Sequence, residues 1–163
     1  MKCEKMIKLK EETIRIAMIN FRKITEENFD VIMKMKRPDG EGYVASNAYS
    51  LAQAWLYRDA NDVYPFAIYN DDEAVGFMML DEDLEERYLV IWRIMFPEEH
   101  QNKGYGTQAI EKIVQMAKKS GKYDYMIIDY VPENTIAGHV YEKVGFKPTG
   151  EISNGEIVMR LNF

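Results

Sequence analysis

A glycine-rich segment from Gln101 to Thr107 has the composition of a loop that binds phosphate groups. Its two glycines let the backbone turn tightly and approach an anion closely. A periodic apolar pattern starts directly after them, so the unpaired N–H groups of a first helical turn would point at the bound anion. A lysine adds positive charge, and a glutamine can donate a hydrogen bond. The residues predicted to hold the phosphates are Gln101, Asn102, Lys103, Gly104, Tyr105, Gly106 and Thr107.

The same segment also fits a dinucleotide-binding fingerprint. Residues Gly104 to Ala109 match the pattern G-x-G-x-x-A, and Asp124 or Asp129 would then be the acid that binds the ribose. That fingerprint follows its strand almost directly and opens a run of parallel β-α-β units. Here a seven-residue loop intervenes, and the strands before it are expected to be antiparallel. Dinucleotide binding is therefore the minor alternative.

The elements that must position this loop follow from apolar periodicity and from turn residues. Asn154-Gly155 between two strand-like runs predicts a hairpin at the end of the chain. Apolar side chains at helical spacing predict inward faces that include Phe29 and Ile136. The pattern predicts strands over 19–24, 66–69, 74–80, 88–96 and 125–130, and helices over 26–37, 47–58, 104–120 and 135–144. The fold class is thus mixed α/β, with a mostly antiparallel central sheet flanked by helices.

Composition limits the classes of protein that remain. A chain of 163 residues with 47% apolar residues fits one domain with a substantial core. We expect that domain over residues 18–163, preceded by an extension over 1–17. The net charge of −6 argues against a nucleic-acid surface and is compatible with a cationic small molecule. No apolar run is long enough to span a membrane, and the lone Cys3 cannot form an internal disulfide. A cytoplasmic protein is the resulting expectation.

Metal chemistry is not predicted. His100 and His139 lie at no metal-ligand spacing with a cysteine or a pair of acids. The sequence also contains no P-loop and no Ser-His-Asp context.

Two spaced motifs resemble the GNAT superfamily of N-acetyltransferases. The signature of Gln or Arg, two residues, Gly, one residue, then Gly or Ala matches Gln101 through Gly106, directly after a strand. Downstream, Asn134, Ala137 and the run from Tyr141 to Phe146 resemble the family's N-x-x-A-x-x-x-Y-x-K-x-G-F motif. The resemblance extends from Ile19 to Phe163, and it implies the GNAT fold with acetyl-CoA as the acetyl donor. Dimers are common in the superfamily, so it also implies a homodimer.

The resemblance assigns a role to each part of the site. Backbone groups of Ile94, Met95 and Phe96 would hold the pantetheine arm and polarise the thioester carbonyl. The glycine loop would hold the pyrophosphate, and Asn134 and Lys143 would contribute to coenzyme binding. Tyr141 would protonate the coenzyme A sulfur as the amine attacks.

Within the superfamily, the segments from Tyr43 to Ala54 and Trp92-Arg93 look like the bacterial spermine/spermidine acetyltransferases. The mammalian enzymes carry an acidic pair where this chain has Trp92-Arg93, so amine recognition would use other acids. The acceptor residues predicted are Glu41, Ser46, Asn47, Asp81 and Trp92, and the candidates for the general base are Glu41, Asp81 and Glu82. The alternatives are acetylation of another amine, such as an aminoglycoside, an amino acid or a protein N-terminus, and a non-catalytic acyl-CoA-binding module.

Overall fold

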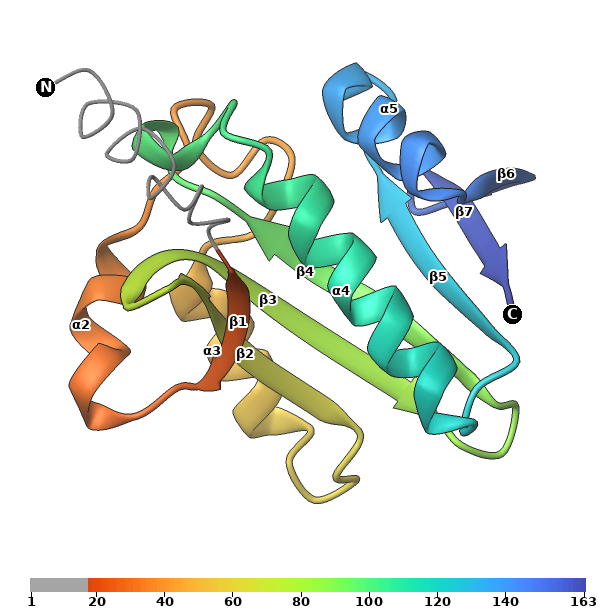
Figure 1. The fold of residues 1–163 in the computed structure, drawn as a ribbon, viewed down its shortest axis with the longest axis horizontal. Helices are drawn as coiled ribbons and strands as arrows, with labels where there is room; N and C mark the ends of the chain where they lie inside the picture. Colours follow the sequence, from red (N-terminus) through yellow and green to blue (C-terminus); the bar gives the residue numbers. More distant parts are fainter. Residues whose placement is uncertain (1–17) are drawn as a thin grey trace, which may run out of the picture.

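A computed structural model describes residues 18–163, which form one seven-stranded sheet with helices on both faces (Figure 1). The predicted extension, residues 1–17, lies outside the described residues. The strands are β1 (Ile19–Lys23), β2 (Val63–Asn70), β3 (Glu73–Asp83), β4 (Tyr88–Met95), β5 (Tyr125–Tyr130), β6 (Lys147–Ser153) and β7 (Glu156–Asn162). The helices are α2 (Glu26–Lys34), α3 (Asn47–Leu56), α4 (Tyr105–Ser120) and α5 (Thr135–Val144), with a short 3₁₀ turn, η1 (Glu98–His100). The predicted element order and the mixed α/β class are confirmed.

The sheet order is β1-β2-β3-β4-β5-β7-β6, and every neighbouring pair is antiparallel except β4 and β5. The parallel pairing runs from Tyr88 opposite Tyr125 to Ile91 opposite Ile128 and then stops. Beyond that point β4 continues to Met95 without β5 beside it. The two central strands therefore diverge and leave an opening in the middle of the sheet.

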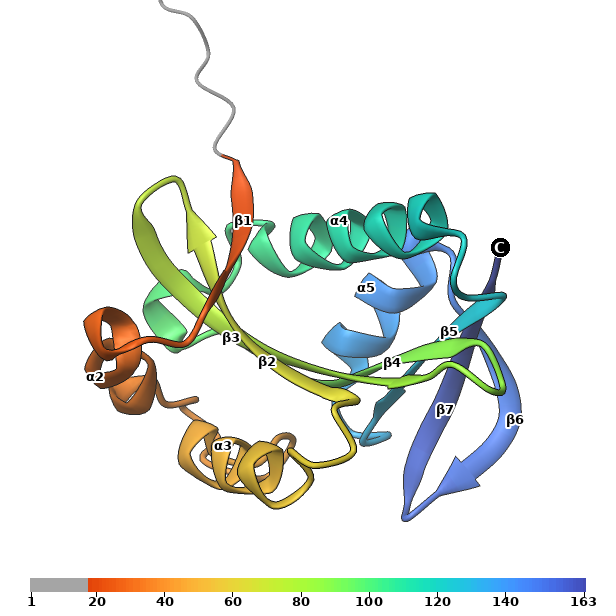
Figure 2. The same cartoon turned by 90° about the horizontal axis from the view of Figure 1, so that it is seen from below.

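The helices divide between the two faces of the sheet. Figure 2 shows α4 and α5 on one face and α2 and α3 on the other. Each face has its own core: Ile110 of α4 and Met126 of β5 lie in one, and Ile32 of α2 and Phe77 of β3 lie in the other. The sheet is thus a central layer whose two surfaces are both covered, as expected for a central sheet flanked by helices.

Glycines and asparagines set the ends of the elements where the sequence predicted them. Gly104 and Gly121 bound α4 with φ of 78° and 66°, a conformation that a side chain disfavours. Asn154 and Gly155 join β6 to β7 with φ of 51° and 84°, as expected for the tight hairpin. The positions of these turns were readable because only a few residue types adopt positive φ.

Two predicted inward side chains were wrong. Phe29 and Ile136 are 48% and 73% exposed. Trp55 of α3 is exposed as well and stacks under the guanidinium of Arg58, 3.8 Å from its ring centroid. In addition, β3 extends through Asp83, beyond the predicted end of this strand at Leu80. Tertiary pairing with β4 outweighs the low strand propensity of the acidic residues in this extension.

A bulge in β4 changes the face of the sheet on which its side chains lie. Met79 of β3 lies opposite Arg93, and Leu80 lies opposite Ile91, so Trp92 is an extra residue in β4. Ile91 packs in the α4 core, whereas Trp92 packs against the core on the α2 and α3 face. Arg93 also reaches α3, so two consecutive side chains face the same side.

Within residues 18–163, no helix has both the length and the apolar character needed to cross a membrane.

Candidate active site

The predicted phosphate loop lines a cavity of about 270 Å³, here called the loop cavity. It lies between the loop before α4, the end of β4 and the start of α5. The first α4 hydrogen bond to the loop runs from the Gln108 N–H to the Gly104 carbonyl at 3.1 Å. The three amides before Gln108 therefore have no partner within the helix, which suits them to bind an anion. The predicted residues that line the cavity are Ile94, Met95, Phe96, Gln101, Asn102, Gly104, Tyr105, Gly106, Thr107, Asn134 and Tyr141.

The loop is held in shape by contacts to β4. The Gln101 side-chain amide donates to the Phe96 carbonyl at 2.9 Å, so its hydrogen bond closes the loop. The Phe96 ring packs on both glycines that flank it: a Cβ at Gly76 would lie 2.8 Å from the ring, and one at Gly106 would lie 3.6 Å away. Gly76 thus allows β3 and the end of β4 to approach closely.

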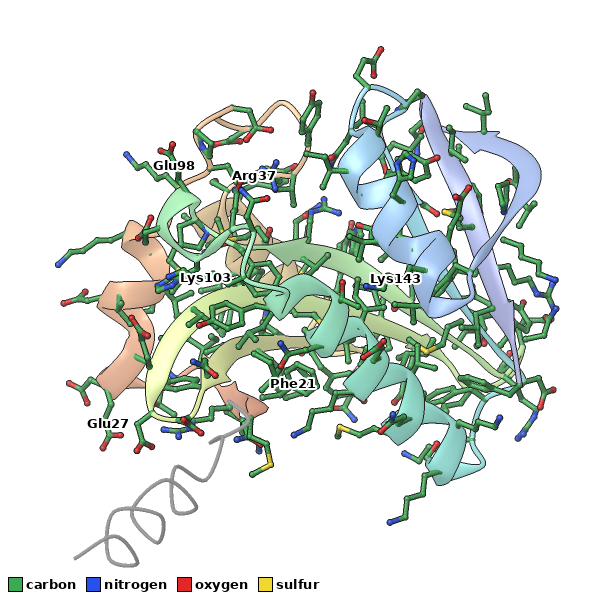
Figure 3. All side chains as sticks on the ribbon, turned by 45° about the horizontal axis from the view of Figure 1, so that its top comes forward. Phe21, Glu27, Arg37, Glu98, Lys103 and Lys143 are labelled. Carbon is green, nitrogen blue, oxygen red and sulfur yellow. The ribbon has the colours of Figure 1, made fainter. Side chains whose placement is uncertain are left out.

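Two lysines predicted to bind the coenzyme do not line the loop cavity. Figure 3 labels Lys103 on the loop before α4 and Lys143 on α5. Both are exposed, and neither is among the lining residues. Their contribution to coenzyme binding stays a prediction.

Apolar α5 residues that the sequence did not single out for the site complete the wall of the loop cavity: Ile136, Ala137 and Val140. Ile136 had the helical spacing of a core residue, but its face of α5 borders the cavity. His100 also lines it, and the Nε2 atom of His100 lies 3.8 Å from a Glu73 carboxylate oxygen.

A second cavity, about 180 Å³, opens where β4 and β5 diverge and is here called the strand cavity. Its walls come from β4, from β5 and the segment after it, and from the loop between α2 and α3. The two cavities share four lining residues: Arg37, Ile94, Asn134 and Tyr141. A molecule in one cavity can therefore meet a molecule in the other beside Tyr141.

Tyr141 is 7% exposed, and its ring lies edge-on to Tyr130 with 5.9 Å between centroids. Burial is the main cause that raises the pKa of the Tyr141 phenol far above its usual value, while the Arg37 charge lowers it. The phenol is therefore protonated at neutral pH. Asn134 is the N-cap residue directly before α5, and its side chain accepts a hydrogen bond from the Ala137 N–H at 3.3 Å.

Two acids in the strand cavity were not predicted as acceptor residues. Asp129 of β5 lies beside Glu156 of β7 in the lining, and one Asp129 carboxylate oxygen is buried without a hydrogen-bond partner in the described structure. Burial, followed by the charges of Glu156 and Glu151, raises the Asp129 pKa. Asp129 and Glu156 also act electrostatically on Tyr141, so all three groups belong to one site.

Two arginines in the strand cavity were also missed. Arg37 forms a two-point ion pair with Asp39, with N···O distances of 2.8 and 3.0 Å, and Figure 3 labels it on the loop between α2 and α3. Arg93 donates to the Trp92 carbonyl at 2.8 Å and to the Gln53 side chain of α3 at 3.3 Å. Burial lowers the Arg93 pKa, with Glu156 acting in the opposite direction. Only the bulge, which the sequence did not reveal, brings Arg93 to this face.

The predicted acceptor residues separate into two groups. Glu41 and Trp92 line the strand cavity. Ser46 caps α3 by accepting from the Tyr49 N–H at 3.3 Å, and it lines a different cavity behind the α2–α3 loop. Asn47 is 2% exposed and donates to the Ile32 carbonyl at 2.9 Å, so it fastens α3 to α2.

Asp81 and Glu82, predicted as base candidates, lie near the C-terminal end of β3, where Asp81 pairs with Val63 and Val90. Neither residue lines the strand cavity or the loop cavity. Glu82 accepts hydrogen bonds from the hydroxyl groups of Tyr64 and Tyr123, which join β2, β3 and the segment before β5. Among the described residues, no group of three or more His, Cys, Asp or Glu is placed to hold a metal ion.

The chain belongs to the Acetyltransferase (GNAT) family, because a sequence profile of that family matches residues 17–146. A curated relative, the uncharacterized N-acetyltransferase YobR of Bacillus subtilis, is 40% identical over 58 residues. That match covers 36% of this chain and only 23% of the relative, so the chain aligns with less than a quarter of that protein's length.

Solved structures share the fold at low sequence identity. Spermidine N-acetyltransferase from Vibrio cholerae, in complex with CoA and spermine, has a TM-score of 0.70 and 18% identity over 88% of this chain and 95% of its own. Aminoglycoside acetyltransferase AAC(6')-Ib in complex with coenzyme A has a TM-score of 0.72 and 17% identity over 88% and 94%. A Salmonella typhimurium acetyltransferase that modifies the N-terminal serine of ribosomal protein L7/L12 has a TM-score of 0.72 and 13% identity over 90% and 95%. The chain therefore has the mixed α/β GNAT fold, and the antiparallel order removes the basis for the dinucleotide alternative.

Proposed function

We propose that this protein is an N-acetyltransferase that transfers an acetyl group from acetyl-CoA to a primary amine of a small acceptor. One observation carries the proposal: the loop cavity and the strand cavity meet at Tyr141, in the opening between β4 and β5. This arrangement allows a donor and an acceptor to approach from two sides and react at their junction. Family membership supports the same reaction.

The loop cavity fits the coenzyme. The unpartnered amides at the start of α4 suit its pyrophosphate, and the apolar wall of Ile136, Ala137 and Val140 suits its pantetheine arm. When bound, acetyl-CoA supplies an acetyl group activated as a thioester. Of the predicted coenzyme residues, those that line the cavity are the ones we retain for direct contact.

Tyr141 is the proposed proton donor to the departing sulfur. Its raised pKa keeps the proton on the phenol oxygen until a strong base forms beside it. The burial that raises the phenol pKa also makes a thiolate in the same place more basic. Arg37, which also lines both cavities, offsets part of the burial effect on the Tyr141 pKa.

Asp129 is the proposed proton acceptor for the amine. An amine must lose a proton to become a nucleophile, and a carboxylate with a raised pKa accepts it more readily than an ordinary one. Asp129 replaces Asp81 and Glu82 in this role because it lines the strand cavity and they do not. Glu41 lines the cavity as well, but it is exposed at the rim.

The acceptors to test first come from the resemblance and from the structural neighbours. Spermidine and spermine are the acceptors that the resemblance implies, and Asp129 with Glu156 would attract an ammonium group. Aminoglycosides and protein N-termini are the alternatives that the neighbours suggest. A homodimer stays a prediction.

An acceptor panel with acetyl-CoA and a thiol-reactive dye tests the proposed reaction. Coenzyme A release that depends on an added amine supports the proposal. Hydroxyl compounds of matched size serve as negative controls. Binding of coenzyme A without turnover on any amine would instead support the non-catalytic module.

Substitution of Tyr141 by Phe tests the proton donor. Removal of a general acid lowers kcat by about 10²- to 10⁴-fold, and the thermal shift produced by coenzyme A should persist. Tyr125→Phe is the matched control, because Tyr125 stacks on Tyr88 at the far end of β5. Equal activity of the Tyr141→Phe variant would remove Tyr141 from the mechanism while leaving acetyl transfer itself intact.

A further inference from the structure

Arg93 is a half-buried cation without a carboxylate partner. A guanidinium has five N–H donors, and the structure gives Arg93 two hydrogen bonds, to the Trp92 carbonyl and to the Gln53 side chain. Its Nε atom is buried and has no partner. Within residues 18–163 no carboxylate forms an ion pair with it, in contrast to Arg37, which Asp39 holds at two points. A cation that has lost part of its hydration without such a partner is unfavourable unless something else binds it.

The acids of the strand cavity leave Arg93 uncompensated. Glu156 is near enough to favour its charged form, but no ion pair joins the two among the described residues. Asp129 and Glu41 also line the cavity, and neither forms an ion pair with Arg93 among the described residues. The other group that acts on it is the Tyr49 hydroxyl of α3.

The strand cavity therefore carries opposite charges at its two ends. Asp129, Glu156 and Arg37 all act on Tyr141, but Arg37 is already paired with Asp39, so the unpaired charge at the proposed reaction centre is negative. Arg93 lies toward α3, where Gln53 contacts it, so the positive end lies away from that centre. A reactive ammonium and an anionic group at opposite ends of one acceptor would match this order.

We infer that the acceptor is a zwitterionic amine, whose anionic group, a carboxylate, binds Arg93 while its amine lies beside Asp129. The inference rests on the proposed acetyl transfer and narrows its acceptor. Spermidine and spermine carry further ammonium groups in place of an anion, so Arg93 repels them, and they are the poorer acceptors.

Three acceptors of equal chain length test this inference: 5-aminopentanoic acid, 5-aminopentanol and 1,5-diaminopentane. They differ only in a terminal anionic, neutral or cationic group. The wild-type kcat/KM should fall in that order. Replacement of Arg93 by Gln should lower kcat/KM for the acid by about 10- to 100-fold, which is the usual effect of losing a charge-assisted hydrogen bond. In the same variant, kcat/KM for the alcohol should change little and kcat/KM for the diamine should rise. KM for acetyl-CoA should stay constant.

Two further variants separate charge from structure. Arg93→Lys keeps the charge and should restore part of the activity on the acid. Arg58→Gln is the matched control, because Arg58 lies over exposed Trp55 outside the cavity. A diamine that equals or exceeds the acid in the wild type, or an Arg93→Gln variant that weakens all three acceptors alike, would overturn the inference.

The failure of the reaction and the failure of the inference give different results. If no amine releases coenzyme A, the proposed acetyl transfer is wrong. Calorimetric binding of 5-aminopentanoic acid to the protein with coenzyme A then tests Arg93 alone. Loss of that binding in the Arg93→Gln variant supports the inference. Binding that is undetectable in the wild type, or equally strong in the wild type and the variant, refutes it.

Discussion

Substitution of Gly76 by Ala should both destabilise the protein and weaken coenzyme binding. Gly76 is buried in β3, and an added Cβ would lie 2.7 Å from the Met95 carbonyl oxygen and 2.8 Å from the Phe96 ring. The first neighbour is backbone of β4, which cannot move without changing the sheet. Overpacking of this kind costs about 1–3 kcal/mol. Alanine recovers about 0.5–1 kcal/mol of that because it restricts the unfolded chain more than glycine does.

The midpoints of these ranges leave a net loss of about 1 kcal/mol, which corresponds to a fall in Tm of about 2–4 °C for a chain of this size. Since Met95 and Phe96 line the loop cavity, KM for acetyl-CoA should rise by about fivefold for each kcal/mol of distortion that binding must reverse. Differential scanning fluorimetry measures the first effect, and initial rates against acetyl-CoA concentration measure the second.

Gly106→Ala is the matched control for stability. Its Cβ would lie 3.6 Å from the same Phe96 ring, which is ordinary contact, and it would lie in the first turn of α4. Its Tm should match the wild type or exceed it, because alanine favours a helix. If the Gly76→Ala variant has the same Tm and the same KM for acetyl-CoA as the wild type, then the close approach of β3 to the end of β4 does not shape the loop cavity.

Two further predictions concern α5 and β5. Asn134→Ala removes the side-chain acceptor that caps α5, so it should lower stability by about 1 kcal/mol, measured by urea unfolding, and an unchanged midpoint would contradict the cap. Asp129→Asn should reduce kcat and yet raise Tm above the wild type at pH 8, with little difference near pH 4. The folded state raises the Asp129 pKa, so it holds that proton more tightly than the unfolded chain, and wild-type stability falls as the carboxyl ionises with rising pH. A Tm for Asp129→Asn below the wild type at pH 8 would contradict this reasoning.

The fold could be predicted from the sequence wherever a backbone conformation is open to only a few residue types. Gly121 and Gly145 end their helices in the left-handed conformation, and β5 and α5 have the predicted limits. The side of a helix that faces the core was less certain. Ile136 has the spacing of a core residue, but the opening beside α5 leaves it exposed at the loop cavity, since periodicity does not distinguish a core from an empty site.

The candidate site was readable where a local motif carried it. The loop residues from Gln101 to Thr107 and Tyr141 are local patterns, and except for Lys103 they line the loop cavity. The strand cavity depends instead on residues far apart in the chain. Asp129 and Glu156 come together only because β5 pairs with β7, and Arg93 joins them only because of the extra residue in β4. No single stretch of sequence contains that information.

The bulge at Trp92 makes the pairing of β4 a determinant of which molecule each part of the strand meets. If β4 kept all its residues and paired with β3 without the bulge, its side chains would alternate strictly from Ile91 onward, so Arg93 would turn toward α4 and Ile94 toward α3. Deletion of Trp92 would instead remove the bulge and leave Arg93 and Ile94 on their present faces. A redesign of acceptor choice should therefore vary the side chains at positions 92 and 93 and preserve the bulge.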